Sequence, residues 1–153
     1  MTFSSNNTDN LTPTSNLIFT CDSNHFDSLS NNQCSDPRLY YQNCRGLNTK
    51  CKDLYTGLLC CDFDVVCLSE TWLSSSIHDS EFCPNIFHVY RSDRDFQRMQ
   101  VCRGGGVLIA IRRKFDAYMI DLSHWGFNSL QFTDAVCVKL VLNYITVYIF
   151  AIY

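Results

Sequence analysis

Residues 38–70 carry the pattern that most constrains the fold of this chain. The run RLYYQNC, Arg38–Cys44, has the length and aromatic content of a β-strand, and Arg45-Gly46 ends it. Apolar residues then recur at spacings of four, three, four and three, which predicts an amphipathic helix over Asn48–Cys61. The continuous apolar run Asp64–Ser69 predicts a strand buried on both faces. Because a crossover of this length joins parallel strands, we expect a parallel βαβ unit with the helix packed on one face.

The later residues predict mainly antiparallel strands. The segment Leu73–Pro84 reads as a loop or short helix, and Ser92–Arg103 as a polar loop. We expect Phe115–Asp121 to be the hairpin partner of the strand that follows Gly104–Gly106. The five strands expected after the βαβ unit are Phe87–Arg91, Val107–Arg112, Phe115–Asp121, Asp134–Leu142 and Tyr144–Tyr153. The predicted class is α/β or α+β with a mixed sheet.

The chain divides into a polar tail and a folded part. Residues 1–37 are rich in Ser, Asn and Thr, contain four Asp and no Lys or Arg, and predict a disordered tail. Residues 38–153 hold all 12 Lys and Arg together with the other 11 Asp and Glu. A near-neutral balance does not by itself indicate a nucleic-acid-binding protein, since such domains are usually basic.

Ten cysteines would suit the disulfide scaffold of a small secreted protein, but other features argue against it. The first 20 residues lack the basic and apolar regions of a secretory signal, and no CxxC pair occurs. We therefore expect reduced, buried thiols in a nuclear or cytoplasmic protein that is not secreted. The apolar run Ala135–Tyr153 approaches the length of a membrane span, but Lys139 and Asn143 interrupt it. Two core strands explain this run better than a membrane helix.

Two polar side chains follow the parallel strands of the predicted βαβ unit. Asn43 lies at the end of the first strand and Glu70 directly after the second. The carboxyl ends of parallel strands meet at one edge of a sheet, where α/β folds bind ligands. Amide and carboxylate oxygens are ligands that Mg²⁺ prefers. A capping Glu and a turn-forming Asn explain the same spacing about equally well.

Five sequence blocks carry a resemblance to a known family. They are YQNCRGLNTK from Tyr41, DVVCLSETWL from Asp64, VYRSDR from Val89, GGGVLIAIR from Gly104 and TVYIFAIY from Thr146. In this order and spacing they resemble the endonuclease/exonuclease/phosphatase superfamily, and most of all the apurinic-type endonuclease domain of non-LTR retrotransposons. The resemblance implies a four-layer α/β/β/α sandwich that hydrolyses phosphodiester bonds with Mg²⁺ and nicks DNA.

The same resemblance assigns roles to individual residues. It implies that Asn43, Glu70 and Tyr153 belong to the catalytic site, that Glu70 and Asn43 bind the metal ion, and that Asn43 orients metal-bound water or a neighbouring catalytic group. Tyr153 corresponds to a tyrosine that hydrogen-bonds the scissile phosphate, and Asp64 to a structural aspartate at the start of a strand. The later family motifs, of the forms GDFN and SDH, do not occur in this sequence. They supply further Asp and Asn residues and the catalytic His.

The resemblance therefore covers about the first half of such a domain. We expect a truncated sandwich that lacks the C-terminal half and nicks DNA barely or not at all. In a full element the domain would be accompanied by a reverse transcriptase. The missing strands should leave apolar faces uncovered along Val138–Leu142 and Tyr144–Ile152.

A run of basic residues between Arg91 and Lys114 has two readings of about equal weight. It would either contact the DNA backbone or form a solvated strand edge. The candidates for a nucleic-acid contact are Arg94, Arg98 and Arg103. The whole chain is thus a truncated retrotransposon-type endonuclease, a non-catalytic nucleic-acid-binding or interaction remnant, or a product that does not fold stably.

Overall fold

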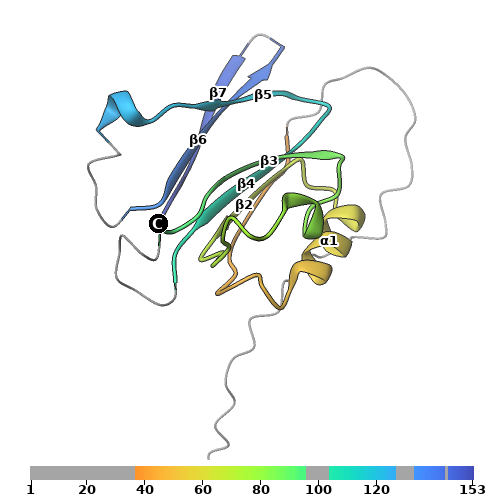
Figure 1. Cartoon of the computed structure of the whole chain (residues 1–153). Coiled ribbons are helices and arrows are strands. Elements are labelled where there is room, and N and C mark those ends of the chain that lie inside the picture. Colours follow the sequence, from red (N-terminus) through yellow and green to blue (C-terminus); the bar gives the residue numbers. More distant parts are fainter. Residues whose placement is uncertain (1–36, 96–103, 127–132, 144) are drawn as a thin grey trace, which may run out of the picture.

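The computed structural model describes residues 37–95, 104–126, 133–143 and 145–153. In these residues the fold is mixed α+β, with mostly strands, one α-helix and two sheets (Figure 1). The predicted polar tail lies outside the described residues, apart from Pro37. The α-helix and strands are β1 (Leu39–Asn43), α1 (Cys51–Cys60), β2 (Val65–Ser69), β3 (Phe87–Ser92), β4 (Val107–Arg112), β5 (Asp116–Ile120), β6 (Ala135–Leu142) and β7 (Ile145–Ile152).

The first sheet has the order β1-β2-β4-β3. Strands β1 and β2 are parallel neighbours, with Asn43 opposite Ser69, and α1 packs on one face of this sheet (Figure 1). The prediction of a parallel βαβ unit is therefore confirmed. The helix begins at Cys51 rather than Asn48, because a tight turn in which the Lys50 amide donates to the Leu47 carbonyl precedes it.

The second sheet has the order β5-β6-β7 and is antiparallel throughout. The expected hairpin between β4 and the Phe115–Asp121 strand is wrong, since β5 pairs with β6 instead. Strand β4 already lies between β2 and β3, so it has no free edge for a third partner. The buried Phe115 ring joins the core between the sheets, where the chain passes from the first sheet to the second.

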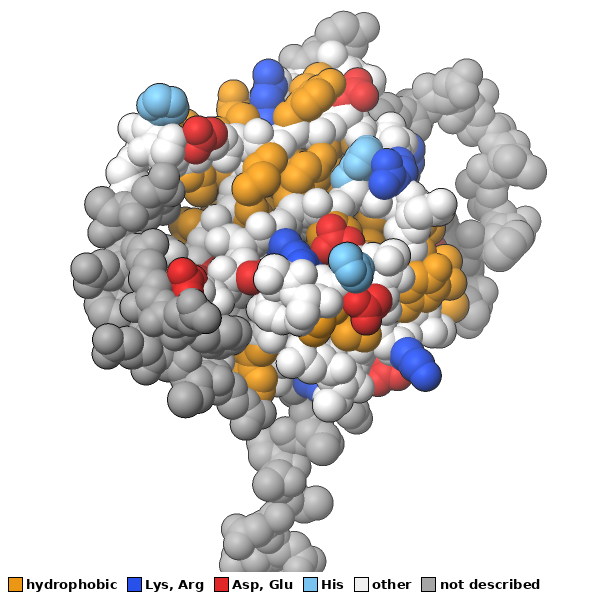
Figure 2. Space-filling view, viewed as in Figure 1, with side chains coloured by type: hydrophobic (Ala, Val, Ile, Leu, Met, Phe, Trp, Pro, Cys, Tyr) orange, Lys and Arg blue, Asp and Glu red, His pale blue; other side chains and the backbone are white. Residues whose placement is uncertain are grey.

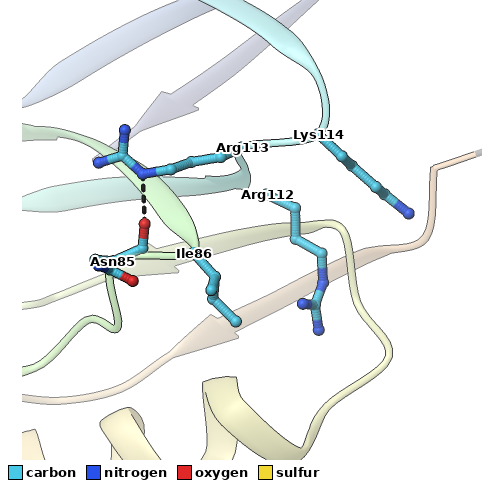
Figure 3. Close-up of a pocket in the computed structure, with 5 residues that line it drawn as sticks. All are labelled: Asn85, Ile86, Arg112, Arg113 and Lys114. Carbon is cyan, nitrogen blue, oxygen red and sulfur yellow. Dashed lines mark hydrogen bonds between the residues drawn. The ribbon is translucent and has the colours of Figure 1, made fainter.

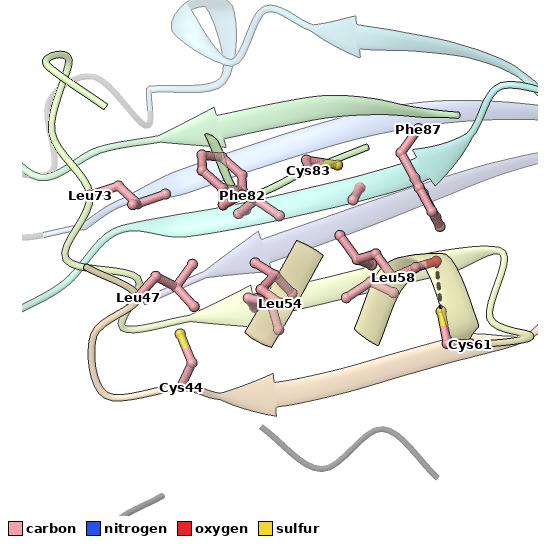
Figure 4. Close-up of a cluster of buried hydrophobic side chains, with 13 residues drawn as sticks. Cys44, Leu47, Leu54, Leu58, Cys61, Leu73, Phe82, Cys83 and Phe87 are labelled. Atoms are coloured by element: carbon pink, nitrogen blue, oxygen red, sulfur yellow. Dashed lines mark hydrogen bonds between the residues drawn. The ribbon is translucent and has the colours of Figure 1, made fainter. Parts of the chain in front are cut away.

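Two hydrophobic cores hold these layers together, and β2 contributes to both. Val66 and Leu68 pack in one cluster with Leu54 and Leu58 of α1. Figure 4 labels these two leucines of the helix. Val65 and Cys67 face the second sheet and belong to the other core. All five residues of β2 are buried, as the continuous apolar run predicted. Two-sided burial makes β2, together with its neighbour β4, an interior strand of the molecule.

The cysteines that the structure describes are all free thiols. Five of them are buried, and burial raises the pKa of Cys44 and of Cys67 to about 11. A thiol with a raised pKa is protonated at neutral pH and reacts slowly. Across the described segments, helices fall short of the length and hydropathy needed to cross a bilayer.

Part of the second sheet carries exposed apolar side chains, and Figure 2 shows hydrophobic patches on one face of the molecule. The expectation for Val138–Leu142 is wrong for Val138 and Leu140, which are buried because they face the first sheet. Strand β7 is largely exposed, as expected. The exposed large side chains of the second sheet and its connections are Tyr118, Met119, Trp125, Ile145, Val147, Tyr148, Phe150 and Ile152.

The first sheet also has an uncovered strip at β1. Strand β7 packs against β2 and β4, and β6 packs against β4 and β3. Leu39 and Tyr41 point toward the side of the second sheet, since they lie opposite Val65 and Cys67, yet they are 54% and 63% exposed. Among the described residues, the second sheet is therefore one strand too narrow to cover the first.

Candidate metal and phosphate site

Three strands bring polar side chains to one edge of the two sheets. Asn43 ends β1, Glu70 directly follows β2 and Tyr153 directly follows β7. The Tyr153 hydroxyl donates a hydrogen bond to Glu70 Oε1 over 2.6 Å, and this bond links the second sheet to the first. The Asn43 side chain also hydrogen-bonds the Glu70 carboxylate. The structure thus places the three residues that the sequence singled out within one cluster.

The backbone around Glu70 adopts conformations that L-residues rarely take. Arg45, Glu70 and Trp72 have φ values of 46°, 52° and 53°. In the described residues one other non-glycine residue, Asn143, has a positive φ, and it lies in the turn between β6 and β7. Such conformations cost about 1–3 kcal/mol each and persist where the surroundings fix them, commonly at functional sites.

Hydrogen bonds on both sides of the chain fix the strained segment after β2. On one side, the Gly46 amide donates to the Glu70 carbonyl over 2.7 Å, and the Leu47 amide donates to the Thr71 carbonyl over 2.8 Å. On the other side, the Trp72 amide donates to the Gly105 carbonyl over 3.0 Å. The main chain at Glu70 is therefore fixed by contacts from two neighbouring segments, and this sets the position from which the Glu70 side chain extends.

Two glycines near the site lack a Cβ atom at positions where a neighbouring side chain packs directly against the main chain. Gly46 has a φ of 93°, and a Cβ there would lie 2.5 Å from Cε3 of the Trp72 ring. Gly105 has a φ of 75°, and a Cβ there would collide with the Arg94 guanidinium. Gly104–Gly106 directly precede β4, as the sequence predicted. The absence of a Cβ atom at Gly105 and Gly106 also leaves room for the side chains of Arg94 and Thr71.

Asp134 organises a second group of contacts beside the first. Its side chain is buried, and Oδ2 accepts hydrogen bonds from Arg94 Nε at 2.9 Å and from the Gly106 amide at 2.8 Å. The Arg94 guanidinium carbon lies 5.3 Å from the centroid of the Tyr153 ring. The sequence pattern did not identify Asp134 as a site residue. Its one distinguishing feature in the sequence is that it is a carboxylate directly before the apolar strand β6.

The hydrogen bonds at the site stabilise the ionised form of Glu70. The bond from Tyr153 is the main cause that lowers the pKa of Glu70, and bonds from Asn43 and Trp72 act in the same direction. The same bond raises the pKa of the Tyr153 hydroxyl, because ionisation would remove the proton that it donates to Glu70. Glu70 is thus a carboxylate and Tyr153 a neutral donor at neutral pH.

The donor set at this edge offers a Mg²⁺ ion one carboxylate, that of Glu70. Asn43 turns its NH2 group to Glu70, while its Oδ1 accepts from the Arg45 amide over 3.2 Å. Mg²⁺ commonly binds through one or two carboxylates while it keeps several waters. Within the described segments no group of three or more His, Cys, Asp or Glu side chains lies close enough together to hold a metal ion. A metal ion here would therefore need further oxygen ligands from water or from a phosphate.

The basic residues are mostly engaged within the protein. Arg94 bonds Asp134, while Arg98 and Arg103 lie outside the described residues, so their contact with nucleic acid stays a prediction. Arg112 donates to backbone carbonyls, and Lys114 pairs with Asp64 over 2.7 Å.

Arg112, Arg113 and Lys114 line a hollow of about 350 Å³, where Arg113 donates to the Asn85 carbonyl (Figure 3). This hollow lies at the end of β4 remote from Glu70, because Val107, at the other end, pairs with Ser69. Asp64 also accepts from the Arg38 amide and so fixes the start of β2 against β1. These contacts favour the structural reading of the basic run at this end of the molecule.

No protein-family model matches the chain, and no curated protein matches its sequence.

The fit between Gly105 and Arg94 can be tested with two alanine variants. Both Gly104 and Gly105 have positive φ values, but a Cβ at Gly104 would be no closer than 3.9 Å to Arg94. We expect Gly105→Ala to lower the free energy of unfolding by about 1–3 kcal/mol more than Gly104→Ala, because only the former overpacks the site. Urea unfolding of both variants measures the difference, and equal losses would contradict the close contact.

The hydrogen bond between Tyr153 and Glu70 predicts a pH dependence of stability. A lowered pKa in the folded state stabilises the fold above the unfolded pKa, and this contribution disappears as the pH falls through the folded pKa. In Tyr153→Phe we expect the pKa of Glu70 to rise toward its ordinary value, as measured by carboxyl ¹³C NMR. The stability difference from the parent chain should shrink on acidification. Tyr148→Phe, which changes an exposed tyrosine of the same strand, should leave Glu70 unaffected.

Proposed function

We propose that this chain is the first part of an apurinic-type endonuclease domain of the kind found in non-LTR retrotransposons. The reaction of such a domain is Mg²⁺-dependent hydrolysis of a phosphodiester bond in DNA. The observation that carries the proposal is the hydrogen bond from Tyr153 to Glu70, with Asn43 against the same carboxylate. Asn43 and Glu70 meet because their parallel strands share an edge. Tyr153 lies 83 residues after Glu70 and is brought to the same carboxylate by the second sheet, as the resemblance implies.

The chemistry of the cluster suits a phosphodiester substrate. Glu70 would hold the Mg²⁺ ion, which when bound neutralises negative charge on a phosphate. Asn43 would orient the Glu70 carboxylate through its NH2 group, and it would add its oxygen as a ligand only by turning its side chain away from the Arg45 amide. Tyr153 has one hydroxyl proton, so it can donate either to Glu70 or to a phosphate oxygen in the same space. Arg94 places a positive charge over the tyrosine ring, and the paired Asp134 carboxylate offsets that charge. The strained backbone at Glu70 and Trp72 is a further feature typical of functional sites.

The layers support an incomplete four-layer sandwich. The helix α1 covers the outer face of the first sheet, while the outer face of the second sheet exposes Tyr118, Tyr148 and Phe150. An apolar sheet face of this kind requires cover in a stable domain. In the proposed domain, helices of a C-terminal half would cover this face and a further strand would cover Leu39 and Tyr41. A reverse transcriptase would accompany the domain in a full element.

A non-catalytic nucleic-acid-binding or interaction remnant is the second candidate. It is favoured by the small number of titratable groups at the site, where Glu70 is the one carboxylate beside Asn43 and no described histidine contacts the cluster. The two candidates share the same fold and differ in whether the cluster binds a divalent ion.

Metal binding at Glu70 can be tested with Mn²⁺ as a paramagnetic probe. With 3-fluorotyrosine at position 153, we expect Mn²⁺ to broaden the ¹⁹F resonance and Mg²⁺ to reverse the broadening by competition. Glu70→Gln keeps the shape of the side chain and removes its charge, so the broadening should disappear. The same label at Tyr148, on the outward face of β7, is the matched control and should broaden much less. Equal broadening at both positions would contradict a site at Glu70.

Activity is the second test, with supercoiled plasmid as the substrate and Mg²⁺ in the buffer. We expect the chain alone to nick DNA barely or not at all, since each missing acid–base group typically lowers the rate by ~10²–10⁴-fold. Glu70→Ala provides the background rate. Robust nicking that disappears in Glu70→Ala would show that the chain is already a complete catalyst.

A further inference from the structure

Asp134 fixes the main chain of Tyr153. The Asp134 amide donates to the Tyr153 carbonyl over 3.0 Å, and the Tyr153 amide donates to the Asp134 carbonyl over 2.9 Å. This reciprocal pair extends the ladder between β6 and β7 by one position beyond β7. It fixes the main-chain position of Tyr153, but it does not fix the direction of the ring, because two side-chain torsions remain free.

The Asp134 side chain fixes Arg94. Arg94 Nε and Nη2 donate to the same oxygen, Oδ2, over 2.9 Å and 2.7 Å. The two side chains are 14% and 6% exposed, so this is a partly desolvated ion pair and not a surface contact. Gly105 leaves the space into which the guanidinium fits. Arg94 is therefore held in one place, unlike an ordinary surface arginine.

The position in which Arg94 is held lies over the face of the Tyr153 ring. Its guanidinium carbon is 5.3 Å from the ring centroid, within the range of a cation–π interaction. At the tip of the same ring the Tyr153 hydroxyl donates to Glu70 Oε1. The ring thus contacts a cation at its face and a carboxylate at its hydroxyl, and that hydroxyl is the group assigned to the phosphate.

We infer that Arg94, held by Asp134, is a positioning residue that sets the direction of the Tyr153 ring and so delivers its hydroxyl to Glu70. The inference rests on the proposed function, because the hydroxyl matters only if it contacts a phosphate there. Arg94 acts through Tyr153 and need not touch the substrate itself. Asp134 acts indirectly, because it fixes the main chain of Tyr153 and holds the side chain of Arg94.

A purely structural ion pair would make a different prediction. It would fasten the segment after β3 to the start of β6, and its loss would loosen that junction without changing the tyrosine ring. A positioning role requires that the ring itself responds. The experiment therefore observes Tyr153 directly instead of relying on stability.

The probe is 3-fluorotyrosine at position 153 in the full chain, observed by ¹⁹F NMR. We expect the parent resonance to be displaced from that of a solvent-exposed fluorotyrosine, and Arg94→Met to remove most of this displacement. Arg94→Lys keeps a cation near the ring and should recover a large part of it. Arg113→Met removes an arginine at the far end of β4 and should change nothing. An unchanged resonance in a folded Arg94→Met chain overturns the inference.

Arg94→Met leaves the buried Asp134 carboxylate without its cation, so this variant can unfold for reasons unrelated to Tyr153. The double variant Arg94→Met, Asp134→Asn removes that charge as well and keeps the test valid. Amide chemical shifts of β1 and β2 report whether the fold is intact. We expect the double variant to show the same loss of ¹⁹F displacement, and retention of the parent resonance overturns the inference.

The Mn²⁺ titration on the same labelled parent chain separates the two proposals. If the ¹⁹F chemical shift at position 153 changes in Arg94→Met but Mn²⁺ does not broaden the resonance, the positioning role is supported and the metal site is contradicted. If Mn²⁺ broadens the resonance but its chemical shift is the same in Arg94→Met, the metal site is supported and the positioning role is contradicted.

Discussion

The two-sided burial of β2 is the constraint on which the rest of the structure depends. Its alternate residues belong to different cores, Val66 and Leu68 to the one under α1, and Val65 and Cys67 to the one between the sheets. A strand in this position can expose polar groups only where it ends. Glu70 is the first residue after that end, and the apolar strand behind it cannot shift without disturbing both cores. The main chain that carries the Glu70 carboxylate is therefore firmly placed.

Around this fixed point the polar contacts form a chain across the two sheets. Glu70 accepts from Tyr153, the Tyr153 ring lies under Arg94, and Arg94 bonds Asp134. Asp134 then returns to the backbone of Tyr153 and to the amide of Gly106. These contacts form a closed loop, in which Tyr153 is contacted at its main chain, at the face of its ring and at its hydroxyl.

The sequence predicted the parts of this arrangement that depend on local pattern. The helical spacing and the apolar run at 64–69 predicted the parallel βαβ unit. Because parallel strands end at the same edge of a sheet, they also predicted that Asn43 and Glu70 lie close together. The sequence pattern did not predict the partner of β5, because β4 takes both of its partners from the earlier strands β2 and β3 and leaves β5 to pair with β6. The pairing of Arg94 with Asp134 spans 40 residues and has no periodic signature. Charge alone therefore suggested either a contact with nucleic acid or a solvated strand edge.

The bond between Tyr153 and Glu70 has a consequence for the order of events during synthesis. Its two residues are 83 positions apart, and the carboxylate is made long before the hydroxyl. The βαβ unit can form from local contacts while the ribosome is still adding the second sheet. During that interval Glu70 and Asn43 lack the group that completes the cluster. A nascent chain therefore holds a half-built site until β7 has emerged and docked.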